Sequence, residues 1–253
     1  MKNLIQLTRK VFGLAIFAFA FAGSPQKAGA VVITNCGDAG STFGTACGLN
    51  ELIVGGSFTI NDKLFSNWTL GLFGGQALST ELIRVDLIDN LGRPGFTLFD
   101  TGTAFRVENG VNSRNELSFE VSITGGPFSI IANELNVGFG EVSGNASASV
   151  FKDAADGGGN LLTSLSAVCN TPSCANSSIG IESAAFLPQT LLQVVKDIDL
   201  SSGAVGAEGV AEINTITQLF TQQANIPEPG IFALLLVGIA IGLQRLGYRS
   251  TRM

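Results

Sequence analysis

The amino-acid sequence predicts an all-β protein whose central part is an antiparallel β-sandwich of jelly-roll-like type. Three observations lead to this fold class. Apolar and polar residues alternate along many short stretches of residues 31–225, and Gly-rich turns separate these stretches. Charged residues make up only 13% of the chain, whereas Gly accounts for 32 of its 253 residues. Low charge and abundant Gly favour strands and turns over helices.

The clearest strand pattern is in NELSFEVSITG, where Leu117, Phe119, Val121 and Ile123 alternate with polar residues. IANELNVGF and LIRVDLIDN alternate in the same way, and similar runs occur at 68–73, 96–107, 147–151, 191–200 and 212–220. Successive side chains of a strand point to opposite faces, so each run predicts a half-buried strand. Turns are expected at GRPG, ENGVN, TGGP, KDAADGGGN and LSSG. About 195 residues are enough to bury a sizeable core.

Residues 1–30 have the three parts of a secretory signal peptide in the required order. Basic residues come first, the apolar stretch 11–22 follows, and Ala28 and Ala30 are small residues at positions −3 and −1 of a cleavage site after Ala30. The sequence therefore predicts an exported protein whose mature domain begins at residue 31. The alternative is a retained N-terminal membrane anchor.

The C-terminal segment 226–253 begins with the motif Pro227-Glu228-Pro229. A residue that precedes proline is kept out of the helical region, so this motif holds the chain extended. Pro229 is also suited to the first position of a helix. The motif is therefore expected to present an extended segment immediately before a helix.

An apolar run and three arginines follow the motif. Residues 230–243 carry no charge, and Arg245, Arg249 and Arg252 come after them. As a helix the uncharged run measures about 20 Å, so it crosses a ~30 Å hydrocarbon layer only if Arg245 snorkels to the interface. The positive-inside rule then places the arginines on the cytoplasmic side. The segment predicts a single transmembrane helix; a helix lying on the membrane surface would need a polar face, which is missing here.

The order of Pro-Glu-Pro motif, apolar span and arginines closely resembles the PEP-CTERM sorting signal of exported bacterial proteins. The resemblance implies recognition by a membrane-embedded exosortase, cleavage near the motif and transfer to a surface or extracellular polymer. Tails of this family usually end in contiguous arginines, whereas those here are spaced. Residues 47–68 and 187–222 are also similar to segments of exported PEP-CTERM proteins, which implies a shared β-sandwich and no defined chemistry.

The expected exported domain contains all four cysteines of the chain: Cys36, Cys47, Cys169 and Cys174. An even number in an oxidising compartment predicts two disulfide bonds. Of the three possible connectivities, we favour the local pairs Cys36–Cys47 and Cys169–Cys174. The spacing fits a four-cysteine zinc site poorly.

Composition excludes several classes of function. The chain has no histidine, which excludes Ser-His-Asp and Cys-His enzymes. Residues 31–225 hold seven basic and nineteen acidic residues, a formal net charge of about −12, which argues against nucleic acid as a partner.

Two groups of acidic residues are candidates for Ca²⁺ binding, although neither has the spacing of an EF-hand. Asp153 and Asp156 lie with Asn160 in a Gly-rich loop, and Asp197 and Asp199 are expected on one face of a strand. A solvated turn and a polar sheet face are the alternatives, so we expect no metal. No carboxylate pair stands out as a glycosidase site.

Sugar-binding surfaces usually expose several Trp or Tyr side chains, and Trp68 and Tyr248 are the only ones in this chain. The eighteen Phe residues are expected in the core and in the signal peptide. Aromatic content therefore argues against an extended carbohydrate-binding surface.

Together these features predict a non-enzymatic exported protein with no cofactor and a structural or adhesive role at the cell surface or in the extracellular matrix. The expected partners are the membrane before processing, an exosortase-like enzyme and extracellular polysaccharide. The expected route leads through a single-pass inner-membrane intermediate to the cell surface or the medium. The alternative is a glycan- or calcium-binding surface module permanently anchored by its C-terminal helix. A membrane-anchored enzyme that uses carboxylates is a further alternative.

Overall fold

The computed structural model describes residues 31–32, 46–90, 92–170, 179–206 and 208–224. All of them belong to one compact unit, Val31–Met253, which is distinct from Met1–Ala30. The expected signal peptide, the C-terminal sorting segment and two of the cysteines lie outside the described residues. Predictions for the following residues therefore stay predictions: Ala28, Ala30, Cys36, Cys174, Pro227, Glu228, Pro229, Arg245, Arg249 and Arg252. Within the described ranges, no helix has the length and apolar character needed to cross a membrane.

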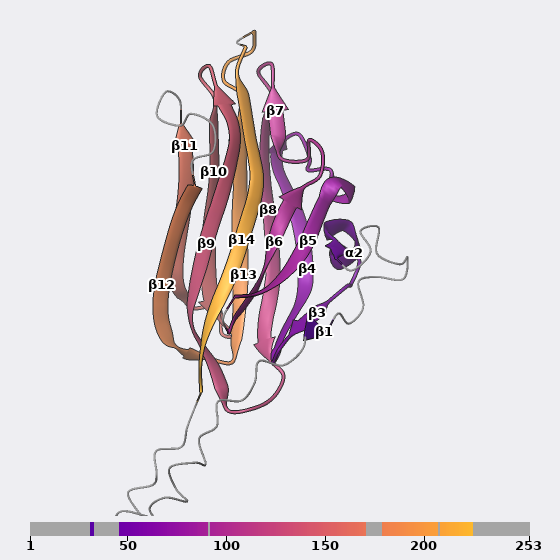
Figure 1. Cartoon of the computed structure of the whole chain (residues 1–253). Coiled ribbons are helices and arrows are strands. Elements are labelled where there is room, and N and C mark those ends of the chain that lie inside the picture. Colours follow the sequence, from indigo (N-terminus) through magenta and orange to yellow (C-terminus); the bar gives the residue numbers. More distant parts are fainter. Residues whose placement is uncertain (1–30, 33–45, 91, 171–178, 207, 225–253) are drawn as a thin grey trace, which may run out of the picture. The chain divides into compact units, whose positions relative to one another are not determined.

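The described residues form two seven-stranded sheets in which every pairing is antiparallel, which confirms the prediction of an all-β sandwich (Figure 1). The first sheet has the order β1 (Val31–Val32), β3 (Phe58–Ile60), β4 (Lys63–Gly75), β8 (Asn112–Ile123), β13 (Leu191–Ser201), β10 (Ser147–Asp156) and β11 (Leu161–Asn170). The second has the order β12 (Ile179–Gln189), β9 (Phe128–Ser143), β14 (Val210–Ala224), β6 (Arg93–Asp100), β5 (Ile83–Asn90) and β2 (Cys47–Gly48), with β7 (Arg106–Glu108) also paired to β14. A short helix, α2 (Leu49–Ile53), and a 3-10 turn, η1 (Thr80–Leu82), complete the described elements.

Two antiparallel ribbons pass from one sheet to the other. In the first ribbon, β8 pairs with β13 in the first sheet, and β9, which follows β8 in the chain, pairs with β12 in the second sheet. Strands β12 and β13 are also consecutive in the chain. At the other end of the strands, β9 and β10 pair with β14 and β13 in the same manner. This connectivity joins the two sheets at both ends of the strands and places residues far apart in sequence on one sheet face.

The core lies between the sheets and follows the alternation expected from the sequence. Leu117, Phe119 and Val121 of β8 are buried, and intervening residues are partly exposed. The centre is aromatic: Trp68 stacks on Phe119 with ring centroids 4.6 Å apart. Four more buried rings join this pair, and they belong to Phe58, Phe65, Phe96 and Phe220. Aromatic pairs of this kind contribute about 0.5–1.5 kcal/mol each beyond the area that they bury.

Some boundaries differ from the expectation. The run 96–107 is not one strand, because β6 ends at Asp100 and a loop leads to β7. The carboxylate of Asp100 explains the break, since it accepts hydrogen bonds from the backbone N–H groups of Gly102, Ala104 and Phe105. These bonds fix a loop in place of the strand pairing. Most of the expected turns GRPG and KDAADGGGN are strand, belonging to β6 and β10.

Three lysines are buried in the sandwich, although lysine side chains ordinarily lie at the surface. Lys63, Lys152 and Lys196 are each no more than 1% exposed. Lys196 donates a hydrogen bond to Oε1 of Gln218 at 2.6 Å, and Lys63 is paired with Asp62 and bonded to Gln222. Burial lowers the pKa of all three amines, because an ammonium group loses its hydration inside the core.

Candidate functional site

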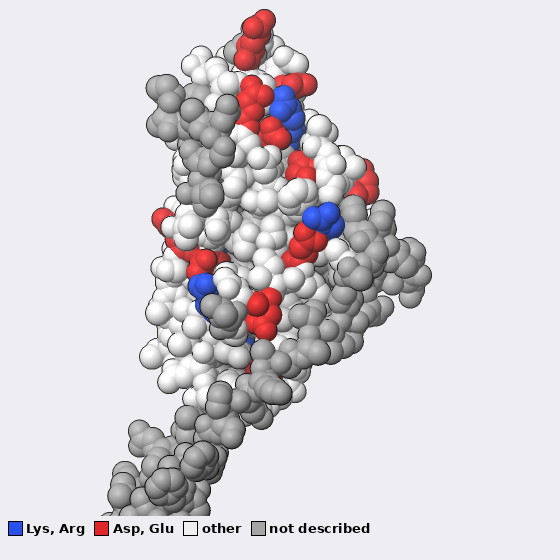
Figure 2. All heavy atoms as spheres, in the orientation of Figure 1, with Lys and Arg blue, Asp and Glu red and all other residues white. Residues whose placement is uncertain are grey.

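The surface charge of the described residues is acidic and locally compensated. Figure 2 shows acidic side chains scattered over one face, with the visible basic groups beside acidic ones. Arg106 contacts Glu108, Glu141 and Glu212. Every other arginine of the described residues also has a carboxylate partner, the pairs being Arg84–Asp86, Arg93–Glu134 and Arg114–Asp199. Such exposed pairs stabilise little. Because each arginine of the described residues is paired with a carboxylate, these arginines form no positively charged patch that could bind a polyanion.

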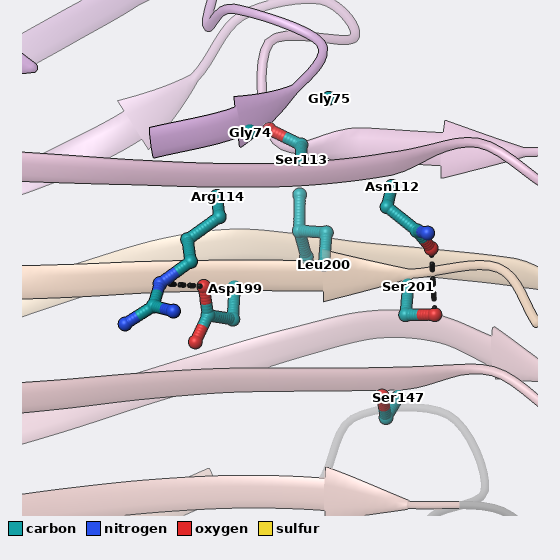
Figure 3. Close-up of a pocket in the computed structure, with 9 residues that line it drawn as sticks. All are labelled: Gly74, Gly75, Asn112, Ser113, Arg114, Ser147, Asp199, Leu200 and Ser201. Carbon is teal, nitrogen blue, oxygen red and sulfur yellow. Dashed lines mark hydrogen bonds and ion pairs between the residues drawn. The ribbon is translucent and has the colours of Figure 1, made fainter. Parts of the chain in front are cut away.

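A hollow of about 440 Å³ lies on the first sheet, where β4, β8, β13 and β10 run side by side (Figure 3). Its lining residues are Gly74, Gly75, Asn112, Ser113, Arg114, Ser147, Asp199, Leu200 and Ser201. Alternation along β8 and β13 sends Asn112, Arg114, Asp199 and Ser201 to the outer face, while Ser113 and Leu200 point into the core. The hollow is therefore open to solvent, and its surface combines apolar area with the polar groups of these four outer-face residues.

Two glycines at the end of β4 make the hollow possible. The register between β4 and β8 shifts between Leu72 and Gly74, so the strand end departs from regular pairing. Gly75 has a φ of 74°, and a Cβ at this position would lie 2.0 Å from the backbone oxygen of Asn112. Only glycine fits there. Because neither glycine has a side chain, the sheet surface is recessed beside Asn112 and Arg114.

The polar groups of the hollow include both hydrogen-bond donors and acceptors. The hydroxyl of Ser201 donates to Oδ1 of Asn112 at 2.8 Å, and Nε of Arg114 lies 3.4 Å from Oδ1 of Asp199 (Figure 3). Desolvation raises the pKa of Asp199, and nearby Asp197 raises it further, while Arg114 acts in the opposite direction. Oδ1 of Asp199 is buried and has no hydrogen-bond partner. The Asp199 side chain is 34% exposed, so a ligand in the hollow can reach this side chain but not its buried Oδ1 atom.

Two exposed phenylalanines flank these polar groups. Phe73 of β4 is 63% exposed, and its ring lies across Gly71, since a Cβ on that glycine would be 3.1 Å from the ring. Phe151 of β10 is 45% exposed and pairs directly with Asp197 of β13. Both rings therefore lie on the outer face, on either side of β8 and β13. The expectation that the Phe side chains of this domain belong to the core is wrong for these two residues and for Phe99, which is 38% exposed.

The four acidic candidates for Ca²⁺ are placed in different surroundings. Asp197 and Asp199 lie on the outer face of β13, and only Asp199 lines the hollow. Asp153 accepts a hydrogen bond from Ser164, and Asp156 accepts several from its own loop. The bonds from Asn160 are the main reason why the pKa of Asp156 is lowered. In the part of the chain that the structure describes, no three His, Cys, Asp or Glu side chains are grouped to hold a metal.

The two cysteines that the structure describes, Cys47 and Cys169, are buried and disulfide-bonded. Their partners lie outside the described residues. The connectivity Cys36–Cys47 and Cys169–Cys174 thus stays a prediction.

Of the residues that line the hollow, only Asp199 was a candidate site residue in the sequence analysis. The lining residues come from four strands that span positions 74 to 201, and no local pattern reports which strands become neighbours. One signal was available for Phe151. In SASVFKDAAD the small apolar residues Ala148, Val150 and Ala154 all occupy even-numbered positions, which predicts that even positions face the core. This alternation places Lys152 inside and Phe151 on the outer face.

No protein-family model and no curated protein matches this chain. Among solved structures, the chain is similar to the enzymatically active domain of bacteriophage CBA120 tailspike protein 4, with 16% identity and a TM-score of 0.30. That match covers 61% of this chain and only 19% of the tailspike chain. The carbohydrate-binding module TmCBM61, solved with β-1,4-galactotriose, has 11% identity and a TM-score of 0.30 over 63% of this chain and 89% of the module. Similarity at this level carries no argument about ligand or activity.

Proposed function

We propose that the protein is a non-enzymatic, exported β-sandwich of jelly-roll-like type that binds extracellular polysaccharide through the outer face of its first sheet. The observation that carries this proposal is an open hollow with several polar side chains, on a sheet face that also exposes two phenylalanine rings outside the hollow's lining. The binding surface comprises Phe73, Asn112, Arg114, Phe151, Asp199 and Ser201, which we call the outer-face site.

The chemistry of the outer-face site suits a saccharide. Sugar hydroxyl groups both donate and accept hydrogen bonds, and Asn112, Arg114, Asp199 and Ser201 offer both kinds of partner. The apolar faces of sugar rings can pack on Phe73 and Phe151, as binding sites commonly combine apolar contact area with a few oriented polar groups. An open hollow on a sheet face also leaves room for the chain of a polymer to continue on either side.

The same hollow favours binding over hydrolysis. Glycosidases use two carboxyl groups that flank the scissile bond. Asp199 is the one carboxylate among the residues that line the hollow, and Arg114 is its ion-pair partner. None of the other residues that line the hollow has a carboxyl group that could act as the second acid or base in bond cleavage.

Affinity electrophoresis of the purified protein through gels that contain single polysaccharides tests the proposal. At least one neutral polysaccharide should retard the protein. Phe73→Ala and Phe151→Ala should each weaken this retardation about tenfold, which corresponds to ~1.4 kcal/mol. Phe99→Ala is the matched control, because Phe99 is an exposed phenylalanine on the other sheet. Two results would refute binding at this face. In one, all three variants and the wild type are retarded equally; in the other, no polysaccharide retards the wild type.

We further propose that the segment 226–253 is a sorting signal cut by an exosortase-like enzyme. The support is its sequence order: Pro227-Glu228-Pro229, an uncharged run, then Arg245, Arg249 and Arg252. On this proposal the prolines hold an extended substrate, Glu228 supplies a recognition charge, and the arginines fix the orientation in the inner membrane until cleavage.

C-terminal peptide mass spectrometry on protein recovered from the producing cells and their medium tests the sorting proposal. A terminus near Pro227 to Pro229 would support a sorting substrate and direct attention to the group joined to the new end. A chain that still ends in Met253 would contradict it and favour a permanently anchored module. This result is independent of the polysaccharide experiment.

A further inference from the structure

One buried amine of the core has no hydrogen-bond partner. Lys152 of β10 is 1% exposed, and its Nζ is buried without any hydrogen bond. Nζ lies over the ring of Phe220, 5.6 Å from the ring centroid. An isolated ammonium group is costly in such surroundings. Burial and the neighbouring Lys196 therefore both lower the pKa of Lys152, which favours its neutral, nucleophilic form.

A buried amide without partners lies next to the same ring. Asn133 of β9 is 1% exposed, and both Nδ2 and Oδ1 are buried without hydrogen bonds. Asn133 pairs directly with Phe220 across β9 and β14, and both side chains are buried on the inner face. Directly opposed residues have Cβ atoms about 5 Å apart. Lys152 of the first sheet and Asn133 of the second are therefore both neighbours of Phe220, Lys152 across the core and Asn133 along the sheet.

We propose that Lys152 and Asn133 form an intramolecular amide cross-link between the two sheets. Nζ of Lys152 attacks Cγ of Asn133, a new C–N bond forms, and the bond from Cγ to Nδ2 breaks. The leaving nitrogen takes up the proton that Nζ releases and departs as ammonia, so atoms and charge balance without a redox partner. The product has one fewer primary amine in the core and joins β10 of the first sheet to β9 of the second.

Lys196 is the group placed to carry the proton. It pairs directly with Lys152 across β10 and β13, and its pKa is lowered to about 7, so it can both accept and donate a proton near neutral pH. Among the described residues Glu51 is the only acidic residue that is buried as a whole, and its carboxylate accepts a hydrogen bond from the backbone N–H of Gly48. Lys196 thus acts as a proton carrier and does not become part of the link.

Intact mass spectrometry of the purified, disulfide-reduced protein is the direct test. The wild-type mass should lie below the value calculated from its sequence by one molecule of ammonia. Digestion at Glu should then yield one branched peptide that contains residues 121–134 and 142–182, because Glu134 and Glu141 separate Asn133 from Lys152. Without a link the same digestion yields two separate peptides.

Two variants provide matched controls. Lys152→Met should show the full calculated mass and give separate peptides, and an apolar side chain of similar length suits the buried site. Lys63→Met removes another buried lysine, which is already paired with Asp62, and should keep the mass deficit and the branched peptide. A wild-type protein of full calculated mass would overturn the proposal. So would a mass deficit with separate peptides, since the ammonia would then have left another residue.

Discussion

Lys196 illustrates at the residue scale how the core depends on single polar contacts. Its side chain is fully buried, and Nζ donates a hydrogen bond to Gln218, whose Nε2 in turn donates to the backbone oxygen of Glu134. Lys196 is thus linked through Gln218 to the facing sheet. The alternation of β13 places this lysine inside, with Val194 and Ile198, so the strand pattern overrides the usual preference of lysine for solvent.

The lowered pKa of Lys196 predicts a pH-dependent stability. The amine has a pKa of about 7 in the folded protein, whereas lysine in an unfolded chain titrates near 10.4. Between these values the unfolded state binds more protons, so the free energy of unfolding should rise as pH increases from about 7 to about 10, on the order of 4 kcal/mol in total. Denaturant titrations at several pH values measure this change. Lys196→Met should be less dependent on pH in this window, and an equal slope in both proteins would contradict the assignment.

The elements differ in how well sequence alone predicts them. Strands β8 and β13 were predictable because one face is buried and the other solvated, which gives a strict alternation. Strands β11 and β12 lie at the edges of the two sheets and were not predicted. Their sequences, LLTSLSAVCN and IGIESAAFLPQ, are rich in small residues and alternate weakly, since edge strands bury less of each side chain. The hollow needs Gly74 opposite Arg114 and Gly75 opposite Ser113, and that pairing is set only by the register of β4 and β8.

Strand β6 offers a prediction at the element scale. Gly95 pairs with Leu219 of β14, and a Cβ on Gly95 would lie 1.8 Å from the backbone oxygen of Gln218. Backbone atoms of a central strand cannot move aside without breaking the pairing of β6 with β14. Gly95→Ala should therefore lower the free energy of unfolding by about 2–4 kcal/mol, at the upper end for a point mutation.

Thermal denaturation measures the effect of Gly95→Ala, and Gly125→Ala is its control. A methyl group on Gly125 would meet open space, and this glycine has no positive φ, so its substitution should change stability by less than ~0.5 kcal/mol. Equal melting temperatures for the two variants would show that β6 and β14 are not packed as closely as described.

At the scale of the whole molecule, the two sheets share one core. The buried hydrophobic residues form a single cluster to which both sheets contribute, and Trp68 and Phe119 of the first sheet contact Phe96 of the second. The sequence could predict the sandwich from its alternation, but not which residues gather on the outer face. That face is assembled by ribbons that cross between sheets, so its composition depends on long-range pairing.

A shared core predicts that the two sheets unfold together. Phe119→Ala removes a ring that stacks on Trp68 and contacts Phe96, and it should lower the free energy of unfolding by about 3–5 kcal/mol. Trp68, the single tryptophan of the chain, reports the centre of the core by fluorescence, while circular dichroism reports all strands. Both signals should shift to the same lower denaturant concentration in the variant and should coincide in the wild type, as expected for an all-or-none transition. A fluorescence change that precedes the loss of strand signal would contradict the shared core, because Trp68 lies on β4 of the first sheet and its ring contacts Phe96 of the second.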